Sequence, residues 1–233
     1  MPEFVFHAGL ADLLPKAWRG RPVFCDTAPH QSAKHAIEAL GVPHSEIGQV
    51  AVNGETRPIS SLLAADDRVD VFPPVPPPAG GEPPRFIADA HLGRLARYLR
   101  FAGFDTLWAN AWDDAELVAI AAREDRVALT CDRALLMHRA LPAGCWLRSR
   151  QPLAQLGEVA RRYALALDGA RASRCLECNA LPLPVAREEV AASLLPGTRA
   201  GFAEFWRCPG CRRIYWRGSH WRRMRAAIVA VDR

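Results

Sequence analysis

The sequence lacks any long hydrophobic run: no stretch reaches about 18 consecutive apolar residues, too few for a membrane-spanning helix. Its N-terminal stretch, MPEFVFHAGLADLLPKAW, also lacks the basic start and apolar segment of a secretory signal. We therefore expect a cytoplasmic protein with no membrane partner. Half of the residues (50%) are hydrophobic, which is enough to form packed cores and argues against a disordered chain.

Lysine is nearly absent, because all but two of the 30 basic residues, Lys16 and Lys34, are arginines. Residues 1–75 carry 6 basic and 9 acidic side chains (−3), residues 76–170 carry 12 and 11 (+1), and residues 171–233 carry 12 and 5 (+7). The guanidinium group of arginine binds phosphate with two hydrogen bonds, which favours a role in binding nucleic acid. A GC-rich genome produces the same excess of arginine over lysine. The C-terminal part is the candidate surface for a nucleic acid.

The run VFPPVPPPAGGEPPR, residues 71–85, separates two units. Its seven prolines and two glycines exclude helix and central strand, so it is typical of a semi-rigid linker. We expect four parts: an α+β unit at 1–75, a linker at 76–84, an α/β unit at 85–170, and a basic segment rich in cysteine and aromatic residues at 171–233.

The first unit alternates short strands with one amphipathic helix. Strands are expected at 3–7, 22–27, 49–52 and 68–72, and the helix at 31–40, with a hairpin turn at Asn53-Gly54. This order resembles the ubiquitin-like sulfur carriers of the ThiS/MoaD kind. Those carriers end in a free Gly-Gly carboxylate, whereas Gly80-Gly81 is internal here. We therefore expect a docking module for a protein partner.

The second unit repeats strand and helix, which predicts a parallel sheet covered by helices. Strands are expected at 86–88, 106–109, 127–130 and 145–148, and helices at 91–102, 114–124, 133–140 and 153–167. Sheets of this kind place their functional sites at the carboxyl ends of the strands.

Acidic residues follow three of these strands: Asp89, Asp132, and the pair Asp113 and Asp114. If the strand ends converge, the carboxylates meet, and a divalent cation such as Mg²⁺ or Mn²⁺ relieves their repulsion. Such an ion activates water and stabilises charge on a phosphate that is being cleaved. The alternative is that each Asp only caps a helix, and Asp113 with Glu116 is close to a capping box.

The cysteines form two pairs of matched spacing, Cys175-x-x-Cys178 and Cys208-x-x-Cys211. Four thiolates complete a tetrahedral shell, so we predict one structural zinc ion and no open position for catalysis. The alternatives are a redox dithiol and two CxxC pairs that occur by coincidence. The remaining cysteines, Cys25, Cys131 and Cys145, are expected to be small core residues.

Two groups of side chains are candidates for RNA contacts. One group lies on the helix at 91–102 and consists of Arg94, Arg97 and Arg100. The other lies in the tail, where arginines alternate with aromatic residues, and consists of Arg212, Arg213, Trp216, Arg217, Trp221, Arg222 and Arg223. Guanidinium groups pair with phosphates and aromatic faces stack on unpaired bases. The alternatives are a solvated basic face on the helix and a small ribbon core, to which we expect Trp206 and Tyr215 to contribute.

Three segments together resemble the Mut-seven C-terminal RNase family: FIADAHLGRLARYLRFAGFDT, DDAELVAIAAREDRVALTCDRAL, and RCLECN with FWRCPGCRRIYWRGSHWRRMR. The resemblance covers about residues 85–226. It implies a PIN-like three-layer nuclease domain fused to a zinc ribbon, with a β-grasp domain in front and a Mg²⁺- or Mn²⁺-dependent site. Asp89 then corresponds to the first acid, Asp114 to the acid that opens a helix, and Asp132 to the acid of a T-x-D motif, with Asp113 and Glu116 near them.

The sequence therefore predicts a metal-dependent ribonuclease, with tRNA or another structured RNA among its candidate substrates. The alternatives are a non-catalytic RNA-binding protein and an adaptor that acts through its β-grasp surface.

Overall fold

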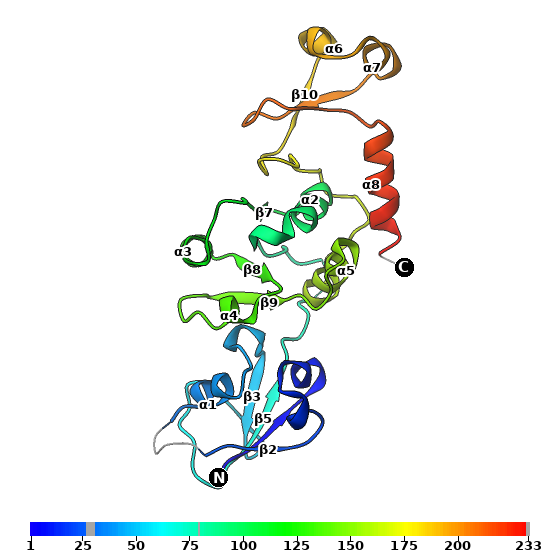
Figure 1. Cartoon of the computed structure of the whole chain (residues 1–233). Helices are drawn as coiled ribbons and strands as arrows, with labels where there is room; N and C mark the ends of the chain where they lie inside the picture. The colour runs from blue at the N-terminus through cyan, green and yellow to red at the C-terminus, as the bar shows by residue number, and fades with distance from the viewer. Residues whose placement is uncertain (27–30, 79, 232–233) are drawn as a thin grey trace.

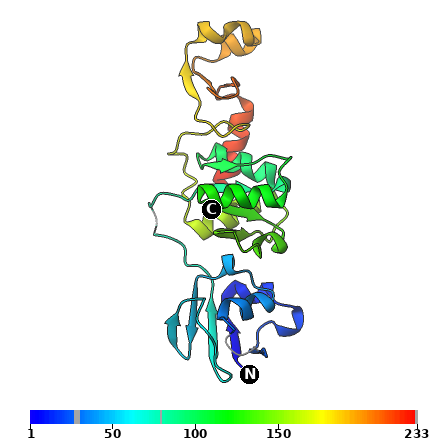
Figure 2. The ribbon, with the colours of Figure 1, turned by 90° about the vertical axis from the view of Figure 1, so that its left-hand side faces the viewer.

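A computed structural model describes residues 1–26, 31–78 and 80–231. Three sheets follow one another along an elongated molecule, with the N-terminal sheet at one end and the cysteine-bearing segment at the other (Figures 1 and 2). In the described ranges, no helix is long and apolar enough to span a bilayer.

The N-terminal unit has a five-stranded sheet of order β2-β1-β5-β3-β4. Its strands are β1 Glu3–Phe6, β2 Val23–Phe24, β3 Gln49–Val52, β4 Glu55–Arg57 and β5 Arg68–Phe72. Strands β1 and β5 are parallel, and the other neighbours are antiparallel. This is the expected β-grasp arrangement, with two differences: β4 was not among the predicted strands, and β2 is shorter than the strand predicted at 22–27, whose last residue lies outside the described residues.

Helix α1, Ala33–Ala39, packs on this sheet through Ala33, Ala36 and Ile37. It begins two residues later than predicted because Ser32 caps it, its hydroxyl accepting a hydrogen bond from the His35 N–H at 3.3 Å. Three short 3₁₀ helices complete the unit: η1 Ala8–Leu13, η2 Lys16–Trp18 and η3 His44–Glu46. Beyond this unit, residues 73–78 and 80–85 carry no helix or strand, as expected of the linker.

The central unit is a parallel sheet of order β7-β6-β8-β9. Its strands are β6 Phe86–Ala88, β7 Thr106–Leu107, β8 Val127–Thr130 and β9 Ala143–Trp146. Its helices are η4 Ala90–Leu92, α2 Gly93–Phe101, α3 Asp114–Glu124, α4 Arg133–Leu136 and α5 Pro152–Tyr163. Helices α4 and α5 are shorter than predicted, and β9 begins two residues earlier.

Two cores lie on opposite faces of this sheet, because alternate residues of a strand point to opposite sides. Phe86, Ala88, Val127 and Leu129 join the core under α2 and α5. Ile87 and Ala128 join the core under α3 and α4. The central unit therefore has three layers, as predicted.

The C-terminal segment forms a small antiparallel sheet of order β10-β11-β12. Its elements are β10 Leu183–Val185, α6 Arg187–Val190, η5 Ala191–Ser193, α7 Pro196–Gly201, β11 Phe205–Arg207, β12 Ile214–Tyr215 and α8 Ser219–Val229. Between the two cysteine pairs the chain reverses direction through the short helices α6 and α7, which lie between β10 and β11. Helix α8 returns to the central unit, where Met224 and Ile228 enter the core under α2 (Figure 1).

A buried ion pair joins the N-terminal and central units. Glu46 is only 2% exposed, and one of its carboxylate oxygens accepts from the Trp146 N–H at 2.7 Å. The other oxygen pairs with Arg162 Nη1 at 2.7 Å. Helix η3 thus occupies the open edge of strand β9, which is where an unpaired strand would otherwise be exposed.

We expect Glu46→Gln to lower the free energy of unfolding by about 2 kcal/mol, because Arg162 loses a charged partner in a buried setting. Urea denaturation followed by circular dichroism measures this. The matched control is Glu55→Gln, whose partner Arg57 lies on an exposed surface and whose loss should change little. Equal effects of the two substitutions would contradict a buried joint between the units.

Candidate functional site

The carboxyl edge of the central sheet carries Asp89 and Asp132 on neighbouring parallel strands. Asp89 follows β6 directly, and its N–H donates to the Leu129 carbonyl at 3.0 Å. Thr130, at the end of β8, donates its hydroxyl proton to Asp89 Oδ2 at 2.7 Å. The same hydroxyl oxygen accepts from the Asp132 N–H at 2.9 Å. One fully buried threonine therefore contacts both the carboxylate of Asp89 and the backbone of Asp132.

Two of the predicted acids are helix caps. Asp132 Oδ1 accepts from the Ala134 N–H at 2.8 Å, and Asp113 Oδ1 accepts from the Glu116 N–H at 2.8 Å. Asp114 and Glu116 lie exposed in the first turn of α3. Asp89, in contrast, makes no cap hydrogen bond to the helix that follows it.

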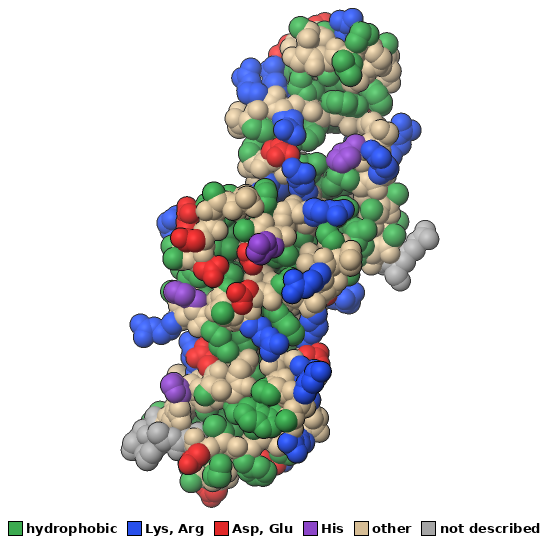
Figure 3. Space-filling model, viewed as in Figure 1, with side chains coloured by type: hydrophobic (Ala, Val, Ile, Leu, Met, Phe, Trp, Pro, Cys, Tyr) green, Lys and Arg blue, Asp and Glu red, His purple; other side chains and the backbone are tan. Residues whose placement is uncertain are grey.

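Within the described residues, no three acidic groups approach one another as closely as the cysteines do, whose ligand atoms lie within 4.8 Å. The structure therefore pairs Asp89 with Asp132 through Thr130 but does not draw Asp114 into the same tight cluster. Asp89 Oδ1 and Asp132 Oδ2 keep no protein partner among these residues. Mg²⁺ is commonly held by one or two carboxylates together with waters and substrate phosphates, so the chemistry of these carboxylate oxygens suits such an ion. Figure 3 shows acidic side chains over the part of the molecule that holds α3 and β8.

Cys131 lies between Thr130 and Asp132, and its side chain contacts the segment that leads into α5. Its sulfur lies 3.8 Å from the Ser149 carbonyl and 3.7 Å from Gln155 Nε2. Burial raises the pKa of this thiol. Cys131 packs against the core under α2 and α5, to which the buried Cys145 belongs.

The four predicted cysteines meet in one place. The Cys175 and Cys211 sulfurs are 3.4 Å apart, and those of Cys178 and Cys208 are 3.2 Å apart. A tetrahedral zinc ion with Zn–S bonds of 2.3 Å separates its sulfurs by about 3.8 Å. The cysteines can therefore hold a zinc ion, with only small adjustments of the side chains.

The pKa of one of these thiols, that of Cys175, is lowered. Burial of Cys175 opposes ionisation, but hydrogen bonds from the Tyr215 hydroxyl and the neighbouring backbone outweigh it and lower its pKa to about 6. This shift favours the thiolate, which is the form that binds metal. Tyr215 is structural, as predicted, since its hydroxyl oxygen also accepts from the Leu176 N–H at 3.1 Å.

Arg100 is not available to RNA, which corrects the prediction for this residue. It is 2% exposed, and its guanidinium donates to the Thr106 carbonyl at 2.8 Å and to the Leu176 and Glu177 carbonyls at 2.9 and 3.0 Å. It therefore fastens α2 to the backbone of the first cysteine pair. Arg94 and Arg97, on the same helix, are exposed.

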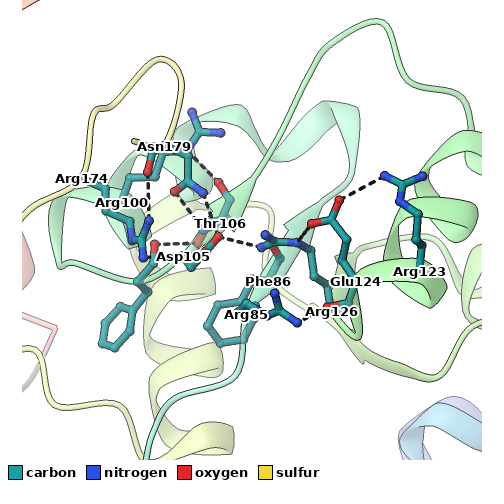
Figure 4. Close-up of polar contacts among 11 residues, drawn as sticks. Arg85, Phe86, Arg100, Asp105, Thr106, Arg123, Glu124, Arg126, Arg174 and Asn179 are labelled. Atoms are coloured by element: carbon teal, nitrogen blue, oxygen red, sulfur yellow. Dashed lines mark hydrogen bonds and ion pairs between the residues drawn. The ribbon is translucent and has the colours of Figure 1, made fainter. Parts of the chain in front are cut away.

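Asp105 and Asn179 add hydrogen bonds between the first cysteine pair and the central sheet, near the amino ends of the strands (Figure 4). Asp105 Oδ1 accepts from Arg126 Nη1 at 2.6 Å and from Asn179 Nδ2 at 2.8 Å. Burial opposes the charge on Asp105, but these hydrogen bonds lower its pKa. Asn179, next to Cys178, thus ties the cysteine segment to the central sheet.

The tail aromatics play different parts. Trp221 packs against the core under α2 and α5, and its ring centroid lies 5.9 Å from that of Phe101. It therefore helps to hold α8 against the central unit. Trp216 is partly exposed and belongs to none of the core clusters. Arg212, Arg213, Arg217, Arg222 and Arg223 are all exposed, as an RNA-binding role requires.

A three-layer parallel sheet with acids at its carboxyl edge, followed by a four-cysteine ribbon, is the architecture expected of a PIN-like domain fused to a zinc ribbon. Residues 84–228 match the family model of the Mut7-C RNAse domain, and residues 1–77 match that of Mut7-C ubiquitin. The chain therefore belongs to the Mut7-C RNAse domain family, which confirms the resemblance. No curated protein and no solved structure was found to match it.

Sequence reasoning missed Thr130 as a functional residue. The sequence nevertheless indicated this threonine. It lies at the buried end of a strand, two residues before an acid, and an apolar core offers its hydroxyl no hydrogen-bond partner.

Proposed function

We propose that this protein is a metal-dependent ribonuclease whose catalytic ion, Mg²⁺ or Mn²⁺, is held by Asp89 and Asp132. The supporting observation is the Thr130 hydroxyl, which bonds to both residues at the ends of neighbouring parallel strands. Membership of an RNAse domain family supports RNA as the substrate class. Asp114, Asp113 and Glu116, at the start of α3, are the candidates to complete the site around bound RNA.

The bound ion would lower the pKa of a coordinated water and neutralise charge on the phosphate under attack. The chain's own residues hold the acids in place. Thr130 orients Asp89 and the backbone of Asp132, and the cap made by Asp132 fixes its side chain at the start of α4. We assign the four cysteines to one structural zinc ion, and the exposed arginines to phosphate contacts.

The test is to incubate the full-length protein with labelled RNA, with and without added Mn²⁺. Mn²⁺-dependent cleavage that is lost in Asp89→Asn, but kept with weaker binding in Arg222→Ala, supports the proposal. RNA that is bound but never cut would favour the second candidate, a non-catalytic RNA-binding protein. The helix caps made by Asp113 and Asp132 favour that candidate, because capping alone accounts for an Asp at each position.

Thr130→Val removes the hydroxyl and keeps the side-chain shape. We expect it to raise the Mn²⁺ concentration needed for half-maximal cleavage by about 10- to 100-fold, as loss of a residue that orients a metal ligand does. The matched control is Thr106→Val, at the opposite edge of the sheet, where the hydroxyl bonds only to the Phe104 carbonyl. A Thr130→Val protein with unchanged Mn²⁺ dependence would rule out this positioning role.

A further inference from the structure

A cleft of about 820 Å³ lies between helix α2 and the C-terminal ribbon. Helix α2 contributes Arg94, Arg97 and Tyr98 to its lining, and the ribbon contributes Arg213, Trp216 and Trp221. Figure 3 shows a hollow between the ribbon and α8 on this side of the molecule. The volume is that of pockets that enclose organic ligands, so it admits nucleotides and not only ions.

The carboxylate of Glu177 forms an ion pair with an arginine from each side of the cleft. Glu177 Oε1 lies 3.0 Å from Arg97 Nη2 on α2 and 3.2 Å from Arg213 Nη1 on the ribbon. All three side chains are partly exposed, so the ion pairs are accessible to solvent. A carboxylate between two guanidinium groups occupies the position that a phosphate oxygen would take, because arginine forks bind both anions in the same geometry.

The aromatic side chains of the cleft favour unpaired bases. Trp216 is partly exposed and packs over Gly218, where a Cβ atom would come within 2.7 Å of the indole nitrogen. Gly218 is thus the residue that allows the indole to lie against the backbone. A duplex hides its base faces, whereas an unpaired strand can stack a base on an indole.

We propose that this cleft binds a single-stranded segment of RNA. A phosphate replaces the Glu177 carboxylate between Arg97 and Arg213, and a base stacks on Trp216. The segment is a loop or an end when the RNA is otherwise structured. The proposal rests on the proposed function for its substrate class, and it adds that the enzyme selects unpaired RNA through its ribbon.

The experiment uses the full-length Asp89→Asn protein, so that binding is measured without cleavage. Fluorescence anisotropy compares one fluorescein-labelled RNA strand with the same strand annealed to its complement. We expect tighter binding of the single strand, and a loss of about 10-fold in Trp216→Ala. Arg97→Ala should reduce the slope of log affinity against log salt by about one. Glu177→Gln should strengthen binding several-fold, because the arginines lose a competing anion.

Trp18→Ala and Arg57→Ala, in the N-terminal unit, are the matched controls and should bind as the parent does. Zinc content shows whether each ribbon variant is folded, and Trp216→Phe, which keeps an aromatic face, should bind better than Trp216→Ala. Equal affinity for single strand and duplex, or a Trp216→Ala protein that binds like Trp18→Ala, would overturn the proposal. If the wild-type protein cuts RNA but the cleft variants bind normally, only this inference fails. If single strands bind in the cleft but Mn²⁺ never supports cleavage, only the proposed function fails.

Discussion

Cys208→Ser is expected to lose the zinc ion and to unfold the ribbon, the largest stability effect that we anticipate in this chain. The ribbon has little core of its own, because only Cys175, Val190, Phe205 and Cys208 of its residues are buried hydrophobics before α8. A structural zinc ion contributes about 10–16 kcal/mol in small domains at neutral pH. Serine cannot replace a buried thiolate as a ligand, so three sulfurs would remain around an incomplete shell.

Metal analysis of the purified protein measures this loss, together with the near-ultraviolet circular dichroism of the ribbon's tryptophans. We expect one zinc ion per chain in the wild type and none in Cys208→Ser. Cys25→Ser is the matched control, since Cys25 lies in the N-terminal unit, far along the chain from the other cysteines. A Cys208→Ser protein with an unchanged spectrum would show that the cysteines do not hold the ribbon together.

The strands of the central sheet were predictable where the chain carries a compact apolar run. The predicted bounds of β6 and β8 are those of the structure, because Phe86–Ala88 and Val127–Thr130 are buried along their whole length. Strand β9 was placed too late, on the apolar residues after Gly144. Pairing with β8 begins at Ala143, and Gly144 must be small because a Cβ there would come within 2.4 Å of Leu136. Such a register depends on packing that the local sequence does not show.

The part played by Arg100 was not predictable from its spacing alone. Arg94, Arg97 and Arg100 recur every three residues, but a helix turns once in 3.6 residues, so the third arginine is rotated by roughly 120° from the first. That rotation carries Arg100 toward the carbonyls of Leu176 and Glu177. The residues that receive it are more than seventy positions away in sequence, so only the fold shows that this arginine is structural.

The acidic site was predicted in its elements but not in its geometry. Asp89 and Asp132 follow strands that the sequence shows to be buried, so their common edge could be inferred. The Thr130 bridge between them depends on the pairing of Ala88 with Leu129, which places the end of β8 beside Asp89. The position of Asp114 depends on the loop at 108–113 that connects β7 to α3, and its part in the site stays a prediction.

Asp89→Asn is expected to abolish Mn²⁺-dependent cleavage, with a loss in rate of more than about 100-fold. The substitution removes a charge that holds the ion. Loss of a residue that only orients a metal ligand already lowers metal affinity or activity by about 10- to 100-fold, so loss of the ligand itself should cost more. The amide oxygen can still accept from Thr130, so the fold should survive. Initial rates with labelled RNA at saturating Mn²⁺, and thermal unfolding of the same samples, measure the two properties separately.

Asparagine also separates the two roles of the capping acids, since Asn caps a helix about as well as Asp. Asp132→Asn keeps the acceptor for the Ala134 N–H but loses the charge, so we expect nearly unchanged stability and a cleavage rate that falls as in Asp89→Asn. Asp113→Asn retains its cap in the same way, so any loss of cleavage in this variant measures what the Asp113 charge adds to the site around bound RNA. If Asp132→Asn cuts RNA as well as the wild type, Asp132 is only a cap and the ion rests on other ligands.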